Sequence, residues 1–329
     1  MSSFPGGHSL TPATPTRLVE AMRRPPLSAL LPVIRGVGQV DFMASYWAGI
    51  LFIVALFVGG WQYGMFGLLG SGVATLTAYV FGAASDRVRL GLEGFPGTLI
   101  GVAFVLYFGT SWVTMLLTIG GCIGGSVLTS AMNSVLTPYS LPTLTAPFCV
   151  ITTVMLLAAS SFRHVAQGRI GPPPPSATRG AIPLSWNEVW QGMFRGIGQV
   201  FFQDKWYVGL IFLVGLLMAS RVAAAAAVLS SLFGMFVAWA LGAPAADVAA
   251  GLYGYNAVLT AMALCGVFVV LSPLGVLFAV IGAASATALT AAITDFFLPF
   301  GGHTLTWPFV LVTWVFLAAI PVLSRLRRT

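Results

Sequence analysis

Two long apolar regions constrain the fold of this chain more than any other feature. Residues 45–160 and 206–323 are dominated by apolar side chains. A helix needs about 20 such residues to cross the hydrocarbon core of a bilayer, so there is room for about ten spans. Only 7% of all residues are charged, against roughly 25% in a soluble domain. These values exclude a water-soluble enzyme, a disordered chain and a nucleic-acid-binding protein. The sequence predicts an all-α polytopic membrane protein.

The formal net charge of +7 indicates membrane topology rather than a polyanionic partner. Basic residues flank the apolar regions at both ends, at Arg17, Arg23, Arg24, Arg325, Arg327 and Arg328. Because basic flanks favour the cytoplasmic side, we expect both termini in the cytoplasm and an even number of spans. We expect residues 1–27 to form a disordered cytoplasmic tail without a signal peptide, and residues 324–329 a basic tail.

The chain repeats itself at a spacing of 160 residues. Arg35–Phe42 (RGVGQVDF) recurs as Arg195–Phe202 (RGIGQVFF), with six of eight positions identical. Further matches pair Gly91–Leu99 with Gly251–Leu259 and, after one inserted residue, Leu144–Phe148 with Leu305–Phe309. Several matches in a constant register indicate an internal duplication.

A proline-rich segment, residues 163–185, separates the two copies and contains four consecutive prolines, Pro172–Pro175. Four consecutive prolines cannot be helical, so we expect an extended, semi-rigid linker there. The first membrane repeat is then expected over residues 28–162 and the second over residues 186–323.

Each half has about five apolar segments of spanning character. In the first half they lie near residues 45–60, 63–82, 92–109, 111–128 and 145–161. An odd number of spans makes the second half enter the membrane from the opposite side, which predicts inverted-topology repeats with a pore at their interface. Residues 27–40 and 186–200 are too short or too polar to span, so we expect one re-entrant helix in each half. The arginines of the linker would then lie outside the cell, whereas the positive-inside rule places basic residues on the cytoplasmic side.

Gln39 and Gln199 are candidate solute-binding residues because they occupy equivalent positions in the two copies. A glutamine amide both donates and accepts hydrogen bonds, which suits a neutral planar solute with C=O and NH2 groups. The alternative is a hydrogen bond between packed membrane helices. The duplicated placement favours the solute interpretation.

Four aromatic residues are also related by the repeat. Phe42 and Phe202 follow the glutamines by three residues, a spacing that predicts the same helical face one turn later. Phe95 and Tyr255 form the next related pair. Two facing pairs could form flat slots that admit planar molecules, although phenylalanine in a membrane protein more often packs in the core or against lipid.

Thr145 and Thr306 each precede an X-Pro-Phe sequence that opens an apolar run. Each hydroxyl could serve a solute as donor and acceptor, or simply cap the following helix. Leu99 and Leu259 are candidate pore walls that have no distinguishing signal beyond their equivalent positions.

No catalytic or metal-binding pattern is present in the sequence, and no cofactor is expected. The three cysteines, Cys122, Cys149 and Cys265, lie in apolar sequence and are interpreted as core residues. His303 is interpreted as either a structural residue or a pore-mouth residue. An ion-coupled transporter usually needs intramembrane ionisable residues. The isolated Asp295 is the best candidate for one, but a passive conduit fits better.

The repeated RGIGQVFF-type segment, the Gly251–Asn256 motif (GLYGYN) and the paired Thr-X-Pro-Phe segments together resemble the urea transporter family. The resemblance covers about residues 28–323. It implies a homotrimer in the bacterial inner membrane, with urea or a similar small amide passing through ten spans and two re-entrant helices in each protomer.

The resemblance also implies residue roles. Gln39 and Gln199 would bind urea at the two ends of a filter, and Thr145 and Thr306 would lie at its narrow centre. The aromatic slots would involve Phe42, Phe95, Phe202 and Tyr255, and the constriction would involve Leu99 and Leu259. The chain departs from the family motif at Pro96, where asparagine is usual, and Tyr255 adds a hydroxyl relative to Phe95.

Alternative functions are a channel for related small amides or ammonia, and an ion-coupled secondary transporter. The first would use the same filter, whereas the second would require an ionisable residue on the transport path.

Overall fold

The computed structural model describes residues 27–162, 164–165 and 184–329. The predicted N-terminal tail, apart from Leu27, and most of the predicted linker lie outside these residues. The described chain is helical and has no named strand. One isolated antiparallel bridge joins Val269 to Arg328, so the predicted C-terminal tail folds back onto the segment that follows η4 (Ala263–Val267).

The two halves contain the same order of helices. The first half comprises α2 (Leu27–Gln39), α3 (Tyr46–Gly59), α4 (Trp61–Val80), α5 (Ser85–Arg89), α6 (Phe95–Phe108), α7 (Trp112–Leu136), η1 (Thr137–Tyr139), α8 (Ala146–Ala158) and η2 (Ala159–Ser161). The second comprises α9 (Trp186–Gly198), η3 (Gln199–Phe201), α10 (Trp206–Ala219), α11 (Arg221–Ala240), α12 (Ala245–Ala249), α13 (Tyr255–Met262), η4, α14 (Pro273–Phe297), η5 (Leu298–Phe300), α15 (Trp307–Ala319) and η6 (Ile320–Val322).

Helix lengths explain how much of the chain can cross a bilayer. Among the described residues, α4, α7, α11 and α14 are long and apolar enough to span alone, and α9 and α10 do so together with a bend of 73°. The helices α3, α6, α8, α13 and α15 are apolar but shorter. A 14-residue helix such as α3 is about 21 Å long, less than the hydrocarbon thickness of about 30 Å. By length alone, therefore, four of the ten predicted spans are complete among the described residues, or five if the bent pair counts as one span.

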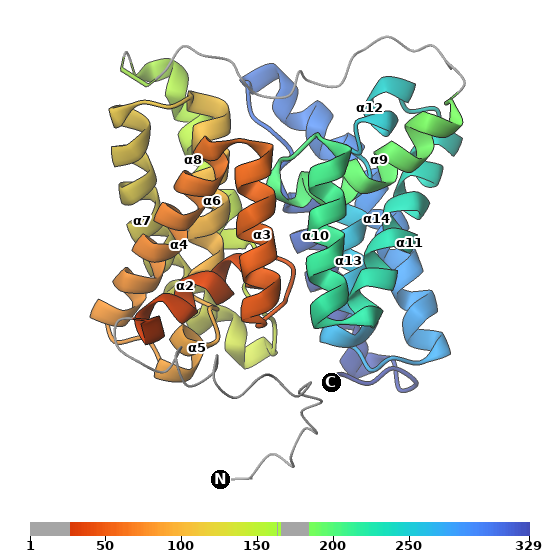
Figure 1. Cartoon of the computed structure of the whole chain (residues 1–329). Helices are drawn as coiled ribbons and strands as arrows, with labels where there is room; N and C mark the ends of the chain where they lie inside the picture. The colour runs from red at the N-terminus through yellow and green to blue at the C-terminus, as the bar shows by residue number, and fades with distance from the viewer. Residues whose placement is uncertain (1–26, 163, 166–183) are drawn as a thin grey trace.

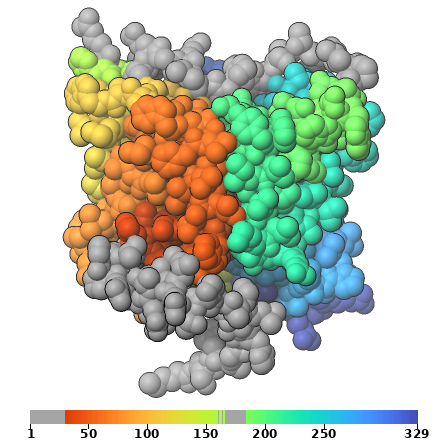
Figure 2. Space-filling view, viewed as in Figure 1, coloured from red at the N-terminus to blue at the C-terminus, as the bar shows by residue number. Residues whose placement is uncertain are grey.

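The two halves stand side by side, the first in orange to yellow and the second in green to blue (Figures 1 and 2). Helices α3 and α10 meet at the centre, where Phe52 packs edge-on against Phe201 and Phe212 at ring-centroid distances of 5.5 and 5.1 Å. Lys205 donates a 2.9 Å hydrogen bond to the Gly59 carbonyl across the same boundary. In Figure 1, α2 and the C-terminus lie near the lower end of the molecule, whereas α9 and α12 lie at the upper end.

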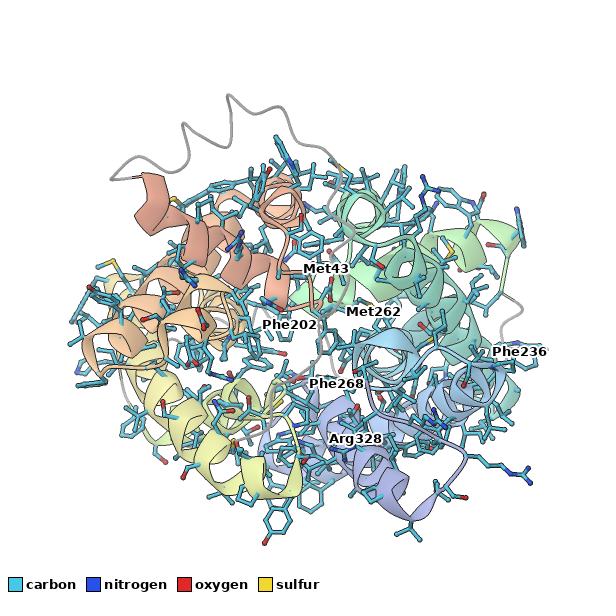
Figure 3. All side chains as sticks on the ribbon, turned by 90° about the horizontal axis from the view of Figure 1, so that it is seen from below. Met43, Phe202, Phe236, Met262, Phe268 and Arg328 are labelled. Atoms are coloured by element: carbon cyan, nitrogen blue, oxygen red, sulfur yellow. The ribbon has the colours of Figure 1, made fainter. Side chains whose placement is uncertain are left out.

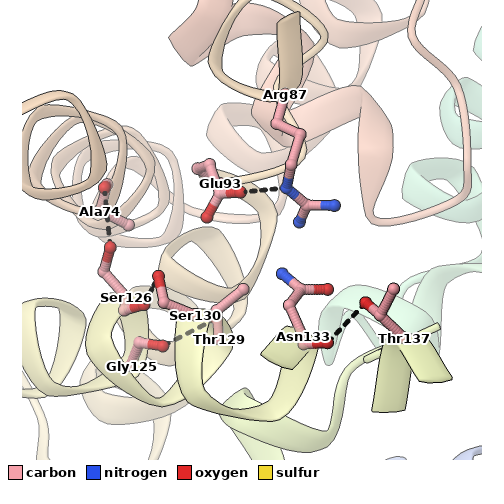
Figure 4. A network of polar contacts seen from close by, with 9 residues as sticks. All are labelled: Ala74, Arg87, Glu93, Gly125, Ser126, Thr129, Ser130, Asn133 and Thr137. Atoms are coloured by element: carbon pink, nitrogen blue, oxygen red, sulfur yellow. Dashed lines mark hydrogen bonds and ion pairs between the residues drawn. The ribbon is translucent and has the colours of Figure 1, made fainter. Parts of the chain in front are cut away.

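The turn before α6 and one face of α7 show how polar groups are satisfied in this apolar protein (Figure 4). Buried Glu93 forms a 2.6 Å ion pair with Arg87. On α7, Thr129 donates to the Gly125 carbonyl of its own helix at 2.8 Å, and Ser126 reaches the Ala74 carbonyl of α4 at 3.4 Å. Such bonds keep hydroxyl groups paired where water is absent.

Candidate functional site

Gln39 and Gln199 lie at the ends of the two short helices α2 and α9 and are held in the same way. Gln39 Nε2 donates to the Leu90 carbonyl at 2.9 Å, and Gln199 Nε2 donates to the Ala250 carbonyl at 3.1 Å. The acceptors, like the glutamines, are 160 residues apart. Within the described residues neither Oε1 atom has a hydrogen-bond partner, so each can accept an N–H group from a solute.

Phe42 and Phe202 do not continue the helical face of the glutamines, and that prediction is wrong. Both residues have left-handed backbones, with φ of 63° and 60°. The Phe42 and Met43 amides bond to the Gln39 and Gly38 carbonyls, which is the Schellman pattern that ends a helix. The Phe202 and Gln203 amides form the same two bonds one repeat later. The chain therefore reverses at each phenylalanine.

The reversal sends each phenylalanine to the other half of the molecule. Phe42 packs edge-on against Phe268 and Phe309 at centroid distances of 5.8 and 6.1 Å. Phe202 packs against Tyr107 at 6.2 Å and Phe148 at 6.0 Å. Seen from below, Phe202 and Phe268 lie near the centre, with Met43 and Met262, while Phe236 points outward at the periphery (Figure 3). The interface between the halves is thus lined by aromatic rings.

Thr145 and Thr306 meet at this interface. Their Oγ1 atoms are 2.6 Å apart, and both side chains are buried. Neither hydroxyl caps the helix that follows it, so the capping alternative is excluded. The thiol of Cys149 lies 3.1 Å from Thr306 Oγ1, a neighbour that the sequence interpretation as a core residue missed. Two buried hydroxyls from opposite halves therefore form a polar contact at the interface.

Leu99 and Leu259 are fully buried in α6 and α13, and their role as pore walls stays a prediction. Phe95 and Tyr255 begin these same helices. Tyr255 shares a cavity with Phe202, whereas no ring contact joins Phe42 to Phe95 within the described residues.

The two halves differ where Phe95 and Pro96 of the first half correspond to Tyr255 and Asn256 of the second. In the second half, the Tyr255 hydroxyl donates to the Leu305 carbonyl at 2.7 Å, and Asn256 Nδ2 adds a second contact at 3.4 Å. In the first half, Phe95 and Pro96 have no groups that could donate these bonds. Within the described residues the Leu144 carbonyl accepts no hydrogen bond, so it is open to a solute N–H group.

A cavity of about 80 Å³ lies beside Gln199 and Phe202. It is also lined by Tyr107 and His303, which the repeat could not identify. The pore-mouth interpretation of His303 is the one that this position favours.

Asp41 is the most deeply buried carboxylate among the described residues, whereas Asp295 is not buried. Asp295 is exposed on α14, so the prediction that it is the best candidate for an intramembrane ion site is wrong. Asp41 is only 1% exposed, and neither of its carboxylate oxygens has a hydrogen-bond partner within the described residues.

Comparison with known proteins now identifies the family. Residues 30–320 match the family described as "Urea transporter". The chain belongs to the urea transporter family. It is 30% identical to Urea transporter 1 of Ovis aries over 289 residues, which cover 87% of this chain and 75% of that protein. It is 27% identical to Urea transporter 1 of Mus musculus over 293 residues, with the same coverage. Membership of this family makes the chain a multi-pass membrane transporter and not an enzyme.

Proposed function

We propose that this protein is a channel-like passive urea transporter whose pathway runs between two inverted-topology repeats, residues 28–162 and 186–323, joined by the linker at 163–185. The observation that carries the proposal is the contact between the Thr145 and Thr306 hydroxyls, one from each half, in the buried centre. The positions of α2 and α9 at opposite ends of the molecule support the inverted arrangement and the re-entrant role of both helices (Figure 1).

The side chains along this pathway match the chemistry of urea. The free Oε1 atoms of Gln39 and Gln199 accept N–H groups at the two ends, and Phe42 and Phe202 exclude solutes that are not flat. At the centre, a solute replaces the contact between the threonines with hydrogen bonds of its own. Leu99 and Leu259 limit the width. Because none of these groups is charged, an uncharged solute crosses without the cost of moving an ion through a low-dielectric region.

The proposal extends to assembly and location. The protein forms a homotrimer in the bacterial inner membrane, surrounded by lipid, and each protomer has its own pore. Both termini lie in the cytoplasm. The lower end in Figure 1, where α2 and the C-terminus lie, is then the cytoplasmic side, and the Gln199 end faces outward.

Two alternatives use different chemistry. Related amides or ammonia could pass through the same filter, and flux ratios for urea, formamide, acetamide and ammonia decide between them. An ion-coupled transporter would need a titrating residue on the path, for which buried Asp41 is the candidate.

The proposal is tested by urea flux into proteoliposomes, measured by stopped-flow light scattering. Thr306→Val keeps the side-chain shape but removes the hydroxyl, so we expect flux to fall about tenfold, the size of one lost hydrogen bond. Thr306→Ser should retain most of the flux. Thr313→Val is the matched control, because Thr313 is buried on α15 and its hydroxyl has no partner within the described residues. Flux by the wild-type protein equal to that of empty liposomes would overturn the proposal.

A further inference from the structure

The cavity beside Gln199 is large enough for a solute. A buried water needs about 10–15 Å³ of probe volume, so about 80 Å³ accommodates several waters or one small molecule. Tyr107 from α6 forms one wall, and Phe202 and Tyr255 form others. Three threonines, Thr290, Thr294 and Thr304, add polar side chains to a remaining lining that also includes leucines.

His303 presents an unpaired imidazole to this cavity. It lies between η5 and α15, and its ring packs on Tyr107 with centroids 4.4 Å apart and planes tilted by 35°. Neither ring nitrogen has a hydrogen-bond partner within the described residues. The Gln199 Oε1 atom that lines the same cavity is also unpaired, so two open polar groups border one space.

Burial keeps this imidazole neutral. It lowers the pKa of His303 to about 4, so at pH 7 one ring nitrogen donates and the other accepts. The other titratable groups that line the cavity are Tyr107, Tyr253 and Tyr255, and tyrosines stay uncharged up to about pH 10. Two acidic residues, Asp247 and Asp295, interact electrostatically with Tyr253, but neither lines the cavity.

The other end of the pathway has no equivalent group. The residue related to His303 by the repeat is Pro142, which has a side chain that cannot form hydrogen bonds. Its carbonyl accepts from Trp314 Nε1 at 2.8 Å. Within the part of the chain that the structure describes, an imidazole therefore borders the pathway at the Gln199 end and has no counterpart at the repeat-related position.

We propose that His303 is a further solute-binding and specificity-determining residue, which with the Gln199 carbonyl forms a binding site for a small neutral amide at one end of the pathway only. The imidazole donates to the solute C=O or accepts from its N–H, while Gln199 Oε1 accepts a second N–H. This inference rests on the proposed urea transport, because the solute class is taken from it.

The first test measures urea flux against urea concentration in proteoliposomes at pH 7. We expect His303→Leu to raise the half-saturating concentration about three- to tenfold, as the loss of one neutral hydrogen bond predicts. His303→Asn retains a donor and an acceptor and should restore a value near that of the wild type. His164→Leu is the matched control, since His164 is exposed and away from the cavity.

The second test uses acid on one side of sealed membrane vesicles of both orientations. At pH 4 about half of the imidazoles are protonated and have lost their acceptor, so we expect wild-type flux to fall by up to about twofold, and only when the Gln199 end is acidified. His303→Asn should remove this response, which also shows that the protein stays folded.

The inference is overturned if His303→Leu leaves the half-saturating concentration unchanged. It is also overturned if His303→Asn fails to rescue, because His303 would then act only through packing on Tyr107. Absence of any urea flux by the wild-type protein would instead refute the proposed function.

Discussion

At the scale of single residues, the two halves of the pathway are equivalent in position but not in chemistry. Gln39 and Gln199 have matching tethers, and the central threonines touch each other. At two other repeat-related positions the halves differ: Tyr255 corresponds to Phe95, and His303 corresponds to Pro142. Both differences add hydrogen-bonding groups to the second half. Small side-chain changes can thus tune one end of a duplicated pathway without changing its fold.

The difference between Phe95 and Tyr255 gives a prediction that can be tested by exchanging the two residue types between the halves. Phe95→Tyr should place a hydroxyl against the open Leu144 carbonyl, as Tyr255 does against Leu305, and so remove an acceptor for the solute. We expect urea flux to fall about three- to tenfold. Tyr255→Phe, the matched reverse change, leaves the Leu305 carbonyl with only the 3.4 Å contact from Asn256 and should not lower flux. Equal losses in the two variants would contradict a role for the Leu144 carbonyl.

At the scale of elements, the close crossing of short helices holds the glutamines in place. A Cβ atom at Gly49 of α3 would lie 2.1 Å from the Ile34 carbonyl oxygen of α2, and one at Gly209 of α10 would lie 1.9 Å from the Phe194 carbonyl oxygen of α9. Only glycine allows backbones to approach so closely. The same contact in both halves fixes each short helix, and with it each glutamine.

Substitution at this crossing should therefore separate the helices. We expect Gly49→Ala to destabilise the protein by about 2 kcal/mol, the usual cost of overpacking, and to lower its melting temperature in detergent. Gly72→Ala on α4 is the control, because a Cβ atom there meets nothing within 4 Å, and alanine is the better helix former. A melting temperature of Gly49→Ala equal to that of the control would show that α2 and α3 can move apart freely.

The repeat explains which parts of this arrangement the sequence could predict. Constant spacing identified Gln39, Thr145 and their partners because duplicated residues occupy duplicated places. It could not find His303 or Tyr107, which have no like counterpart. The reversals at Phe42 and Phe202 were also hidden, because the left-handed backbone at a helix end is usually signalled by glycine.

The different lengths of α6 and α13 could not be predicted from the repeat in the sequence. Helix α6 continues to Phe108, whereas its counterpart α13 ends at Met262 and the chain breaks at Cys265 and Gly266, where Gly266 has φ of 106°. The break turns Phe268 towards Phe42, at 5.8 Å. Packing across the two halves, which no local pattern encodes, decides the geometry here.

At the scale of the whole molecule, the neutral lining of the interface predicts transport without ion coupling. A coupled transporter binds its ion and solute together and needs a group that changes charge during the cycle. Asp41 directly precedes the filter residue Phe42 and is buried. The residue related to Asp41 by the repeat is Phe201, whose ring stacks on that of Phe212 with centroids 4.4 Å apart. The repeat therefore supplies no second carboxylate, and a proton site at Asp41 would exist in only one half.

We expect urea to cross at equal initial rates in both directions at pH 7, when His303 is neutral. Imposed proton or sodium gradients should leave these rates unchanged within about 20%, a margin far below the tenfold change that 1.4 kcal/mol of coupling would produce. Asp41→Asn keeps the shape of the carboxyl but cannot titrate, and it should transport like the wild type. Asp295→Asn serves as the control at an exposed carboxylate. If uptake collapsed with a protonophore and Asp41→Asn lost that dependence, the passive mechanism would be replaced by proton coupling through Asp41.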